Sequence, residues 1–220
     1  MAKVIIFGTT EMAELNHFYL THDTAHEVVA FTVNQDYIKE ETFHELPVVP
    51  FEEVESIYPP SDYKMRVAIL FGRVNKNRAE KYYEAKAKGY ELMNYISSKA
   101  ITWPGLVIGD NCWISENALC QPFAKVGSNV TIMNSSSIGH HSVIGDHCFF
   151  SSHVAVLGGA KVGAHCFLGA NSTVRNDITI GRESVIGAGA LILENTREKS
   201  VYRGNPAVPV PIPSDKLKRI

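Results

Sequence analysis

Apolar residues recur at every sixth position through the second half of the chain. A spacing of six fits neither an α-helix, whose period is 3.6, nor a half-buried strand, whose period is 2. It is typical of hexapeptide repeats that wind into a parallel β-helix. We therefore predict a β-helix here, in preference to a β-sandwich with coincidental spacing. The unbroken series is Ile108, Ile114, Cys120, Val126, Ile132, Ile138, Ile144, Phe150, Val156, Val162, Leu168, Val174, Ile180, Ile186 and Ile192.

A second period of eighteen residues is superimposed on the first. Three hexads then make one triangular coil, with the repeating apolar residue inside and a small residue inside four positions later. Glycine, asparagine and aspartate between them suit the corners, because they tolerate unusual backbone angles. Stacked coils satisfy one another's backbone groups, as in other solenoids. The pairs that mark this period are Ile108-Gly109, Val126-Gly127, Ile144-Gly145, Val162-Gly163 and Ile180-Gly181.

The first hundred residues have a different pattern. Strands are expected over residues 3–8, 27–32, 67–72 and 90–96, and helices over residues 11–20 and 76–88. This alternation predicts a small parallel α/β sheet, whose ligands bind outside the carboxyl ends of the strands. The turn after the first strand lacks the G-x-G-x-x-G pattern, which disfavours a dinucleotide. A phosphate at the following helix N-terminus and a plain glycine turn both remain open.

The chain therefore divides into three parts. Residues 1–98 form the α/β domain, and residues 99–193 form the β-helix. Residues 194–220 lose the six-residue register and are rich in proline, which prevents regular structure. The last coil of a β-helix has an open edge. We expect the tail to cover that edge and the α/β domain to cover the opposite end.

Composition narrows the functional classes. A chain of 220 residues with 45% hydrophobic and 20% charged residues is typical of a soluble globular protein. The net charge of −2 argues against a nucleic-acid surface. No run of about 18 apolar residues predicts a membrane span, and no signal peptide is expected. All four cysteines lie at inward positions, which suggests buried thiols in a reducing cytoplasm.

Five of the nine histidines lie at corners of the predicted prism. His140 falls next to Gly158 in the following coil, and a histidine beside a groove of small residues can act as a general base. His147 and His165 share a column that we interpret as an exposed ladder. For His141 and His153, a functional and a solvated role are both open.

A second corner carries the column Asn134, Ser152, Ala170 and Ala188. Small residues in a column let an extended ligand approach the backbone and bond exposed amides. An extended ligand could therefore lie along this corner.

An α/β domain followed by such a prism, with the segment Ser137-Ile138-Gly139-His140-His141-Ser142-Val143-Ile144-Gly145-Asp146, resembles the PglD/NeuD family. These bacterial acetyltransferases act on nucleotide-linked amino sugars or sialic acid. Gly204-Asn205-Pro206-Ala207 is also similar to the tails of hexapeptide acyltransferases. The resemblance implies a left-handed β-helix and a homotrimer, with acetyl-CoA in grooves between neighbouring prisms and no metal.

The resemblance also implies residue roles. His140 would be the general base, with His141 as the alternative working residue. The Gly158 amide would stabilise the oxyanion, and Ala170 and Ala188 would meet the coenzyme through their backbone.

The nucleotide sugar would bind Thr10, Glu11, Asn34 and Gly72. The family usually has a carboxylate where this chain has His141; Asp146 or a neighbouring chain could orient the base instead. A second family histidine is replaced by Phe149, and His153 could serve nearby as a substrate-binding residue.

The leading hypothesis is an acyl-CoA-dependent N-acyltransferase acting on a nucleotide-linked amino sugar in bacterial surface-glycan biosynthesis. A sugar O-acetyltransferase is the near alternative. The five histidines also raise a zinc hydratase of the γ-carbonic anhydrase type, which the α/β domain does not fit. A binding scaffold without turnover is the third alternative.

Overall fold

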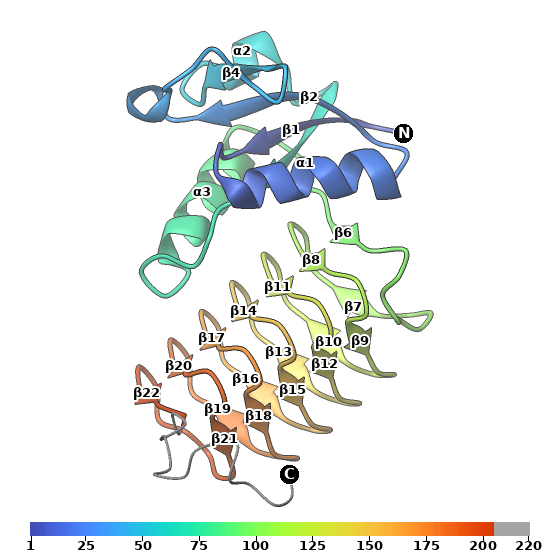
Figure 1. The fold of residues 1–220 in the computed structure, drawn as a ribbon, viewed down its shortest axis with the longest axis vertical. Coiled ribbons are helices and arrows are strands. Elements are labelled where there is room, and N and C mark those ends of the chain that lie inside the picture. Colours follow the sequence, from blue (N-terminus) through green and yellow to red (C-terminus); the bar gives the residue numbers. More distant parts are fainter. Residues whose placement is uncertain (205–220) are drawn as a thin grey trace, which may run out of the picture.

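The computed structural model describes residues 1–204, which form a triangular prism and an α/β domain lying along one of its faces (Figure 1). We call the α/β domain the cap. The predicted fold class, an α/β domain followed by a left-handed parallel β-helix of hexapeptide repeats, is confirmed.

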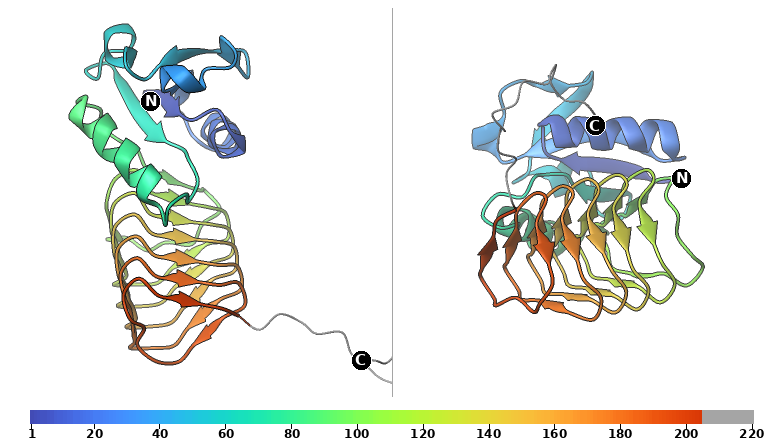
Figure 2. Two further views of the ribbon diagram at one scale, coloured as in Figure 1. Left: turned by 90° about the vertical axis from the view of Figure 1, so that its left-hand side faces the viewer. Right: turned by 60° about the horizontal axis from the view of Figure 1, so that its bottom comes forward.

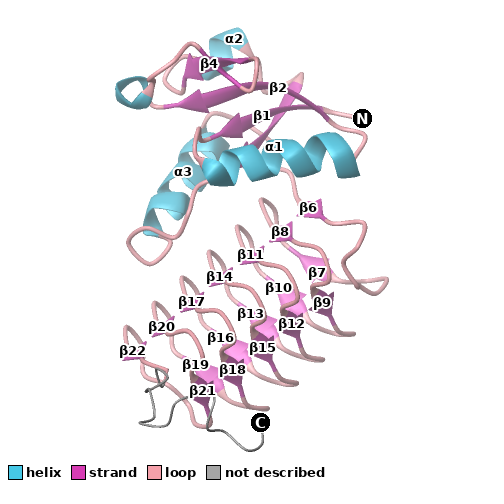
Figure 3. Ribbon diagram, in the orientation of Figure 1, coloured by secondary structure: helices cyan, strands magenta, loops and turns pink. Residues whose placement is uncertain are grey.

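The cap contains one five-stranded sheet in the order β3-β4-β2-β1-β5. It is parallel except for the β3–β4 hairpin, which the hydrophobic pattern did not reveal. Helix α1 (Glu11–Asp23) packs on one face; α2 (Val54–Ile57) and α3 (Lys76–Ala87) pack on the other (Figure 3). A short 3₁₀ helix covers Gln35–Tyr37. The strands are β1 (Lys3–Phe7), β2 (Glu27–Val33), β3 (Thr42–Phe43), β4 (Leu46–Pro50) and β5 (Tyr63–Val67).

The third strand expected over residues 67–72 lies earlier, at β5. Arg66 interrupts the apolar residues of β5 but is nevertheless buried, because its side chain is hydrogen-bonded. A hydrophobicity pattern cannot detect a buried polar residue of this kind. The apolar run that follows leaves the sheet and carries Phe71 onto the prism, where its ring contacts those of Phe149 and Phe167 at 5.0 and 4.7 Å between centroids.

The strand expected over residues 90–96 is also wrong for most of its length. Leu92 makes only an isolated bridge to Met65. The segment Tyr95–Ile96 (β6) is a strand, but it pairs with the first coil of the prism instead of the cap sheet. Strand pairing in the prism thus begins at Tyr95, close to the domain boundary proposed at residue 99.

The prism has three parallel sheets. The cap-facing sheet contains β6, β8 (Trp113–Ile114), β11 (Thr131–Ile132), β14 (Phe149–Phe150), β17 (Phe167–Leu168), β20 (Val185–Ile186) and β22 (Val201–Tyr202). The second sheet contains β9 (Leu119–Cys120), β12 (Ser137–Ile138), β15 (Ala155–Val156), β18 (Thr173–Val174) and β21 (Leu191–Ile192). The third contains β7 (Val107–Ile108), β10 (Lys125–Val126), β13 (Val143–Ile144), β16 (Lys161–Val162) and β19 (Thr179–Ile180).

The register follows the eighteen-residue period: Thr131 pairs with Phe149, and Phe149 pairs with Phe167. The repeating apolar residues from Ile114 to Ile192 are all at most 5% exposed, and Ile108 is half-buried. Three kinds of corner join the sheets. We call them the histidine corner (turns 121–124, 139–142, 157–160 and 175–178), the cap corner (127–130, 145–148, 163–166 and 181–184) and the alanine corner (133–136, 151–154, 169–172 and 187–190).

The cap lies along the cap-facing sheet and does not cover the end of the prism, contrary to expectation (Figure 2). Two buried arginines join the domains. Arg66 donates to the Asn16 side chain at 2.9 Å and to the Asn111 carbonyl. Arg78 donates to Thr131 Oγ1 at 2.5 Å and to the Cys148 carbonyl at 3.0 Å. Burial lowers the pKa of Arg66 to about 9 and that of Arg78 to about 10, so both remain cationic at neutral pH.

At the other end, β22 pairs with β20 and continues the cap-facing sheet beyond the last repeat. Residues 205–220, which include Asn205, Pro206 and Ala207 of the predicted closing tail, lie outside the described residues. Among residues 1–204, no helix combines the length and the apolar character needed to span a membrane.

Candidate active site

His140 lies directly over Gly158 at the histidine corner. A Cβ built on Gly158 would come within 2.5 Å of both Nε2 and Cε1 of the His140 ring. Real Cβ atoms do not approach other atoms so closely, so only glycine leaves room for the ring. The backbone holds this arrangement, since the Gly159 amide donates to the His140 carbonyl at 2.8 Å and the His140 amide donates to Gln121 Oε1 at 2.9 Å.

Gly158, which contacts the ring, also carries a free amide. Within residues 1–204, the Gly158 N–H donates no hydrogen bond to backbone or side chain. Gly139 in the preceding coil permits close stacking, because a Cβ there would lie 2.5 Å from the Gly158 nitrogen. A backbone donor beside a histidine can stabilise a developing oxyanion while the imidazole takes a proton.

His141 is the partner of His140. Their Nδ1 atoms are 3.2 Å apart, and the His141 ring packs on Phe123 at 4.8 Å between centroids. In a neutral imidazole one nitrogen donates and the other accepts. If His140 donates from Nδ1 to His141, its Nε2 keeps a free lone pair over Gly158 and can act as a base. Asp146, considered as an alternative orienting group, lies at the cap corner, where it accepts from the Ser128 amide at 2.7 Å.

Ala170, Ala188 and His153 lie at the alanine corner, which is separate from the histidine corner within one chain. The amides of Ala170 and Ala188 donate no hydrogen bond within the described part of the chain. Gly169 keeps this column open, since a Cβ there would lie 2.6 Å from the Ala188 nitrogen. His153 is exposed. This corner offers free backbone donors along the prism, as an extended ligand requires.

The predicted nucleotide-binding residues lie where the parallel strands of the cap end. Thr10 precedes α1 and Glu11 begins it, after β1. Asn34 follows β2, and its side chain donates to Glu52 at 2.7 Å; this hydrogen bond lowers the pKa of Glu52. Gly72 follows β5 in the segment before α3. The structure thus gathers the candidates into three groups, at two corners of the prism and at one edge of the cap.

The interpretation of His147 as an exposed ladder residue is wrong. Its side chain is 2% exposed, with Nε2 3.0 Å from the Tyr83 hydroxyl and Nδ1 2.9 Å from Asn129 Nδ2. Helix α3 covers this corner. Burial, and to a smaller extent the nearby His165, lowers the pKa of His147 to about 4. His165 is half-buried, and its ring lies 4.7 Å from that of His147. Sequence reasoning missed this because it placed the cap over the end of the prism.

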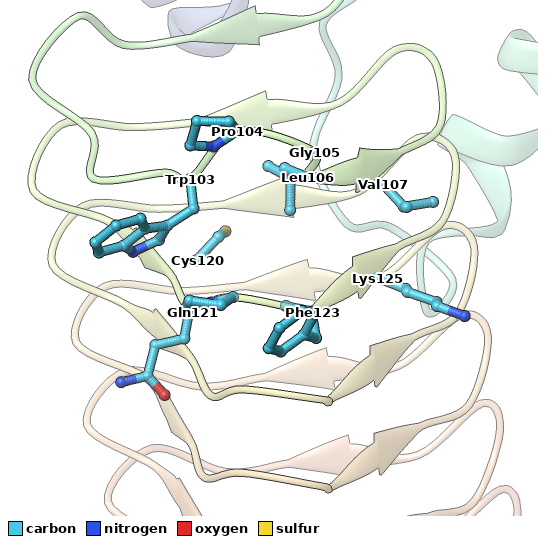
Figure 4. A pocket seen from close by; sticks show the side chains of 11 residues that line it. Trp103, Pro104, Gly105, Leu106, Val107, Cys120, Gln121, Phe123 and Lys125 are labelled. Atoms are coloured by element: carbon cyan, nitrogen blue, oxygen red, sulfur yellow. The ribbon is translucent and has the colours of Figure 1, made fainter.

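Sequence reasoning also missed a cleft beside the histidine corner. The cleft has a volume of about 340 Å³ and lies between residues 103–107 and residues 120–125 (Figure 4). It includes Gln121 and Phe123, the residues that contact His140 and His141. No motif marks it, because its two walls come from consecutive coils.

The histidines of the prism occupy three different corners. In the described chain, no group of three histidine, cysteine, aspartate or glutamate side chains is arranged to hold a metal ion. The repeats themselves match a family model. Residues 123–158 and 159–194 match "Bacterial transferase hexapeptide (six repeats)". No curated protein matches the chain.

Solved structures resemble the chain over both domains. A His-to-Asn variant of perosamine N-acetyltransferase from Caulobacter crescentus, in complex with CoA and GDP-perosamine, is 21% identical with a TM-score of 0.84, covering 93% of this chain and 94% of that one. The acetyltransferase domain of PglB from Neisseria gonorrhoeae FA1090, in complex with acetyl coenzyme A, is 19% identical (TM-score 0.79; 94% and 98% covered). WeeI from Acinetobacter baumannii AYE is 17% identical (TM-score 0.79; 94% and 99% covered). The chain therefore has the two-domain fold of these acetyltransferases, which confirms the resemblance at the level of the fold.

Proposed function

We propose that this chain is an acyl-CoA-dependent N-acyltransferase that acts on the amino group of a nucleotide-linked amino sugar. The observation that carries the proposal is the His140 ring lying over Gly158, whose amide is free. Acyl transfer to an amine requires a general base next to a hydrogen-bond donor for the oxyanion, and His140 and the Gly158 amide supply these two groups side by side. The likeness in fold to acetyltransferases crystallised with CoA supports the same assignment.

His140 Nε2 accepts a proton from the amine as the nitrogen attacks the thioester carbonyl. The C–N bond forms, and the Gly158 amide donates to the carbonyl oxygen as negative charge develops there. Collapse of this intermediate breaks the C–S bond, and the proton held by His140 neutralises the departing thiolate. His141 accepts from His140 Nδ1 throughout, which keeps the imidazole in the required tautomer.

The two substrates would bind on either side of this pair. The amides of Ala170 and Ala188 suit the coenzyme, which needs donors along an extended path. Thr10, Glu11, Asn34 and Gly72 suit the nucleotide, since ligands of parallel α/β sheets bind at this edge. His153 at the alanine corner would contact the sugar. The four free, buried cysteines fit a reducing cytoplasm.

We further propose a homotrimer whose sites lie between copies. Within one chain the cap contacts the cap-facing sheet, whereas His140 lies at the opposite corner, so we place each nucleotide sugar between the cap of one copy and His140 of another. Large apolar side chains are exposed away from the cap, among them Val143, Leu157 and Leu191. Burying them against neighbouring prisms would remove apolar surface from water. Sedimentation equilibrium tests the trimer directly.

The activity is tested by thiol release from acetyl-CoA with UDP-, dTDP- and GDP-linked amino sugars. We expect release with one sugar and a loss of at least a hundredfold in His140→Ala. His22→Ala, an exposed histidine on α1, is the matched control and should retain the rate. Full activity in His140→Ala would refute the proposed base. Turnover only with hydroxy sugars would identify an O-acyltransferase, and no release with any donor or acceptor would favour a binding scaffold.

A further inference from the structure

The cleft between residues 103–107 and residues 120–125 is part of the same site as the histidine pair. Phe123 lines it and packs on His141, and Gln121 lines it and accepts from the His140 amide. We propose that this cleft binds the acyl chain of the donor and that the preferred chain is longer than acetyl. The inference rests on the proposed acyltransferase function and specifies its donor.

The lining favours a hydrocarbon over a sugar. Trp103 and Phe123 are 54% and 72% exposed, and with Leu106 they form one contiguous apolar surface in the cleft. Figure 4 shows these three side chains grouped around the opening, whereas Gln121 and Lys125 extend to its margins. A sugar would lose water from its hydroxyls with few partners in return, and each unpaired group is costly. A hydrocarbon chain loses nothing of this kind.

The position of the cleft relative to His140 along the prism agrees with this assignment. The thioester carbon carries sulfur on one side and the acyl chain on the other, so the two leave the reaction centre in different directions. The coenzyme would lie toward the C-terminal coils, which carry the free amides of Ala170 and Ala188. On the N-terminal side of His140 the histidine corner leads into the cleft. A carbonyl lying beside both His140 and Gly158 would therefore direct its chain toward Trp103.

The volume exceeds what an acetyl group needs. A cleft of about 340 Å³ has room for about ten groups the size of a water molecule, at ~30 Å³ each. Each methylene removed from water should improve kcat/KM by about fourfold when fully buried. For hexanoyl-CoA, with four more methylenes than acetyl-CoA, we expect a gain of at least tenfold even if burial is half complete.

The test compares kcat/KM for acetyl-, butyryl-, hexanoyl- and octanoyl-CoA with a single amino-sugar acceptor. Val107→Trp fills the cleft from its third-sheet wall, where Val107 is 57% exposed and its replacement disturbs no core. Thr179→Trp is the matched control, because Thr179 is an exposed residue of the same sheet at β19. We expect the hexanoyl-to-acetyl ratio to fall at least tenfold in Val107→Trp and to be retained in Thr179→Trp.

Three results would overturn the inference. Acetyl-CoA as the best donor would show that the cleft takes no chain. An unchanged ratio in Val107→Trp would show that the cleft does not select the donor. Loss of the assembly in that variant, seen by sedimentation together with an equal loss for all donors, would make these residues a subunit contact. Acetyl transfer without a chain preference refutes this inference alone, whereas no transfer from any donor refutes the proposed function and the inference with it.

Discussion

Replacing Gly158 by alanine is the sharpest perturbation that the structure offers. The added Cβ would lie 2.5 Å from the Nε2 and Cε1 atoms of His140 and 3.0 Å from its Nδ1. Gly158 has an ordinary negative-φ backbone, so alanine strains nothing there. The only group that must move is the imidazole at the end of a rotatable side chain. The substitution therefore displaces the proposed base and leaves the coil intact.

The size of the effect follows from that displacement. An ordinary contact requires about 3.5–4 Å, so the ring must shift by about 1 Å. A misplacement of this size costs about a hundredfold in rate when the group must be aligned with a reacting atom. We expect kcat/KM to fall by about a hundredfold while the thermal midpoint stays within a few degrees of the parent. Gly139→Ala is the contrasting variant, because its Cβ would meet the Gly158 backbone at 2.5 Å and should destabilise the fold.

The assay is steady-state thiol release combined with thermal unfolding, and it includes the double variant Gly158→Ala/His140→Ala. If alanine acts by moving the ring, it has no further effect once the ring is absent, and the two losses are non-additive. Full activity in Gly158→Ala would refute the geometric argument. Additive losses would show that the added methyl group acts independently of the position of His140.

Three further outcomes test other parts of the structure. The folded-state pKa of His147 is lowered to about 4 from an ordinary 6.5, so the unfolded chain binds a proton more readily than the folded one and the fold loses stability as pH falls from 6.5 toward 4. The free energy of unfolding, measured with urea, should be about 2 kcal/mol lower at pH 4.5 than at pH 7, and the difference should be clearly smaller in His147→Asn. Arg78→Met should lower the free energy of unfolding by about 3 kcal/mol, because Thr131 and the Cys148 carbonyl lose a buried donor; a change below 1 kcal/mol would contradict the structural role of Arg78. Prolonged treatment with EDTA should leave acyl transfer unchanged, and parallel loss of zinc and activity would restore the hydratase alternative.

The sequence by itself determined the β-helix. Its information is local and repeated: one apolar residue in six points inward, and the coil eighteen residues later satisfies the backbone. The same frame placed His140 beside Gly158, because residues at equivalent positions in consecutive coils must stack. The strand at β1 and the helices α1 and α3 were also predicted, since each has a continuous pattern of its own.

Only the tertiary structure decided what the cap does to the prism. Its helix α3 covers the corner that carries His147, which turned an expected surface residue into a buried one. The strand β5 escaped prediction because Lys64 and Arg66 alternate with its apolar residues, whereas a continuous apolar run follows it. The 340 Å³ cleft and the separation of His140 from the cap depend on contacts between distant segments. Such contacts depend on how two folded surfaces pack against each other. A periodic pattern specifies the inner face of each element, but it does not specify which neighbour covers the outer face.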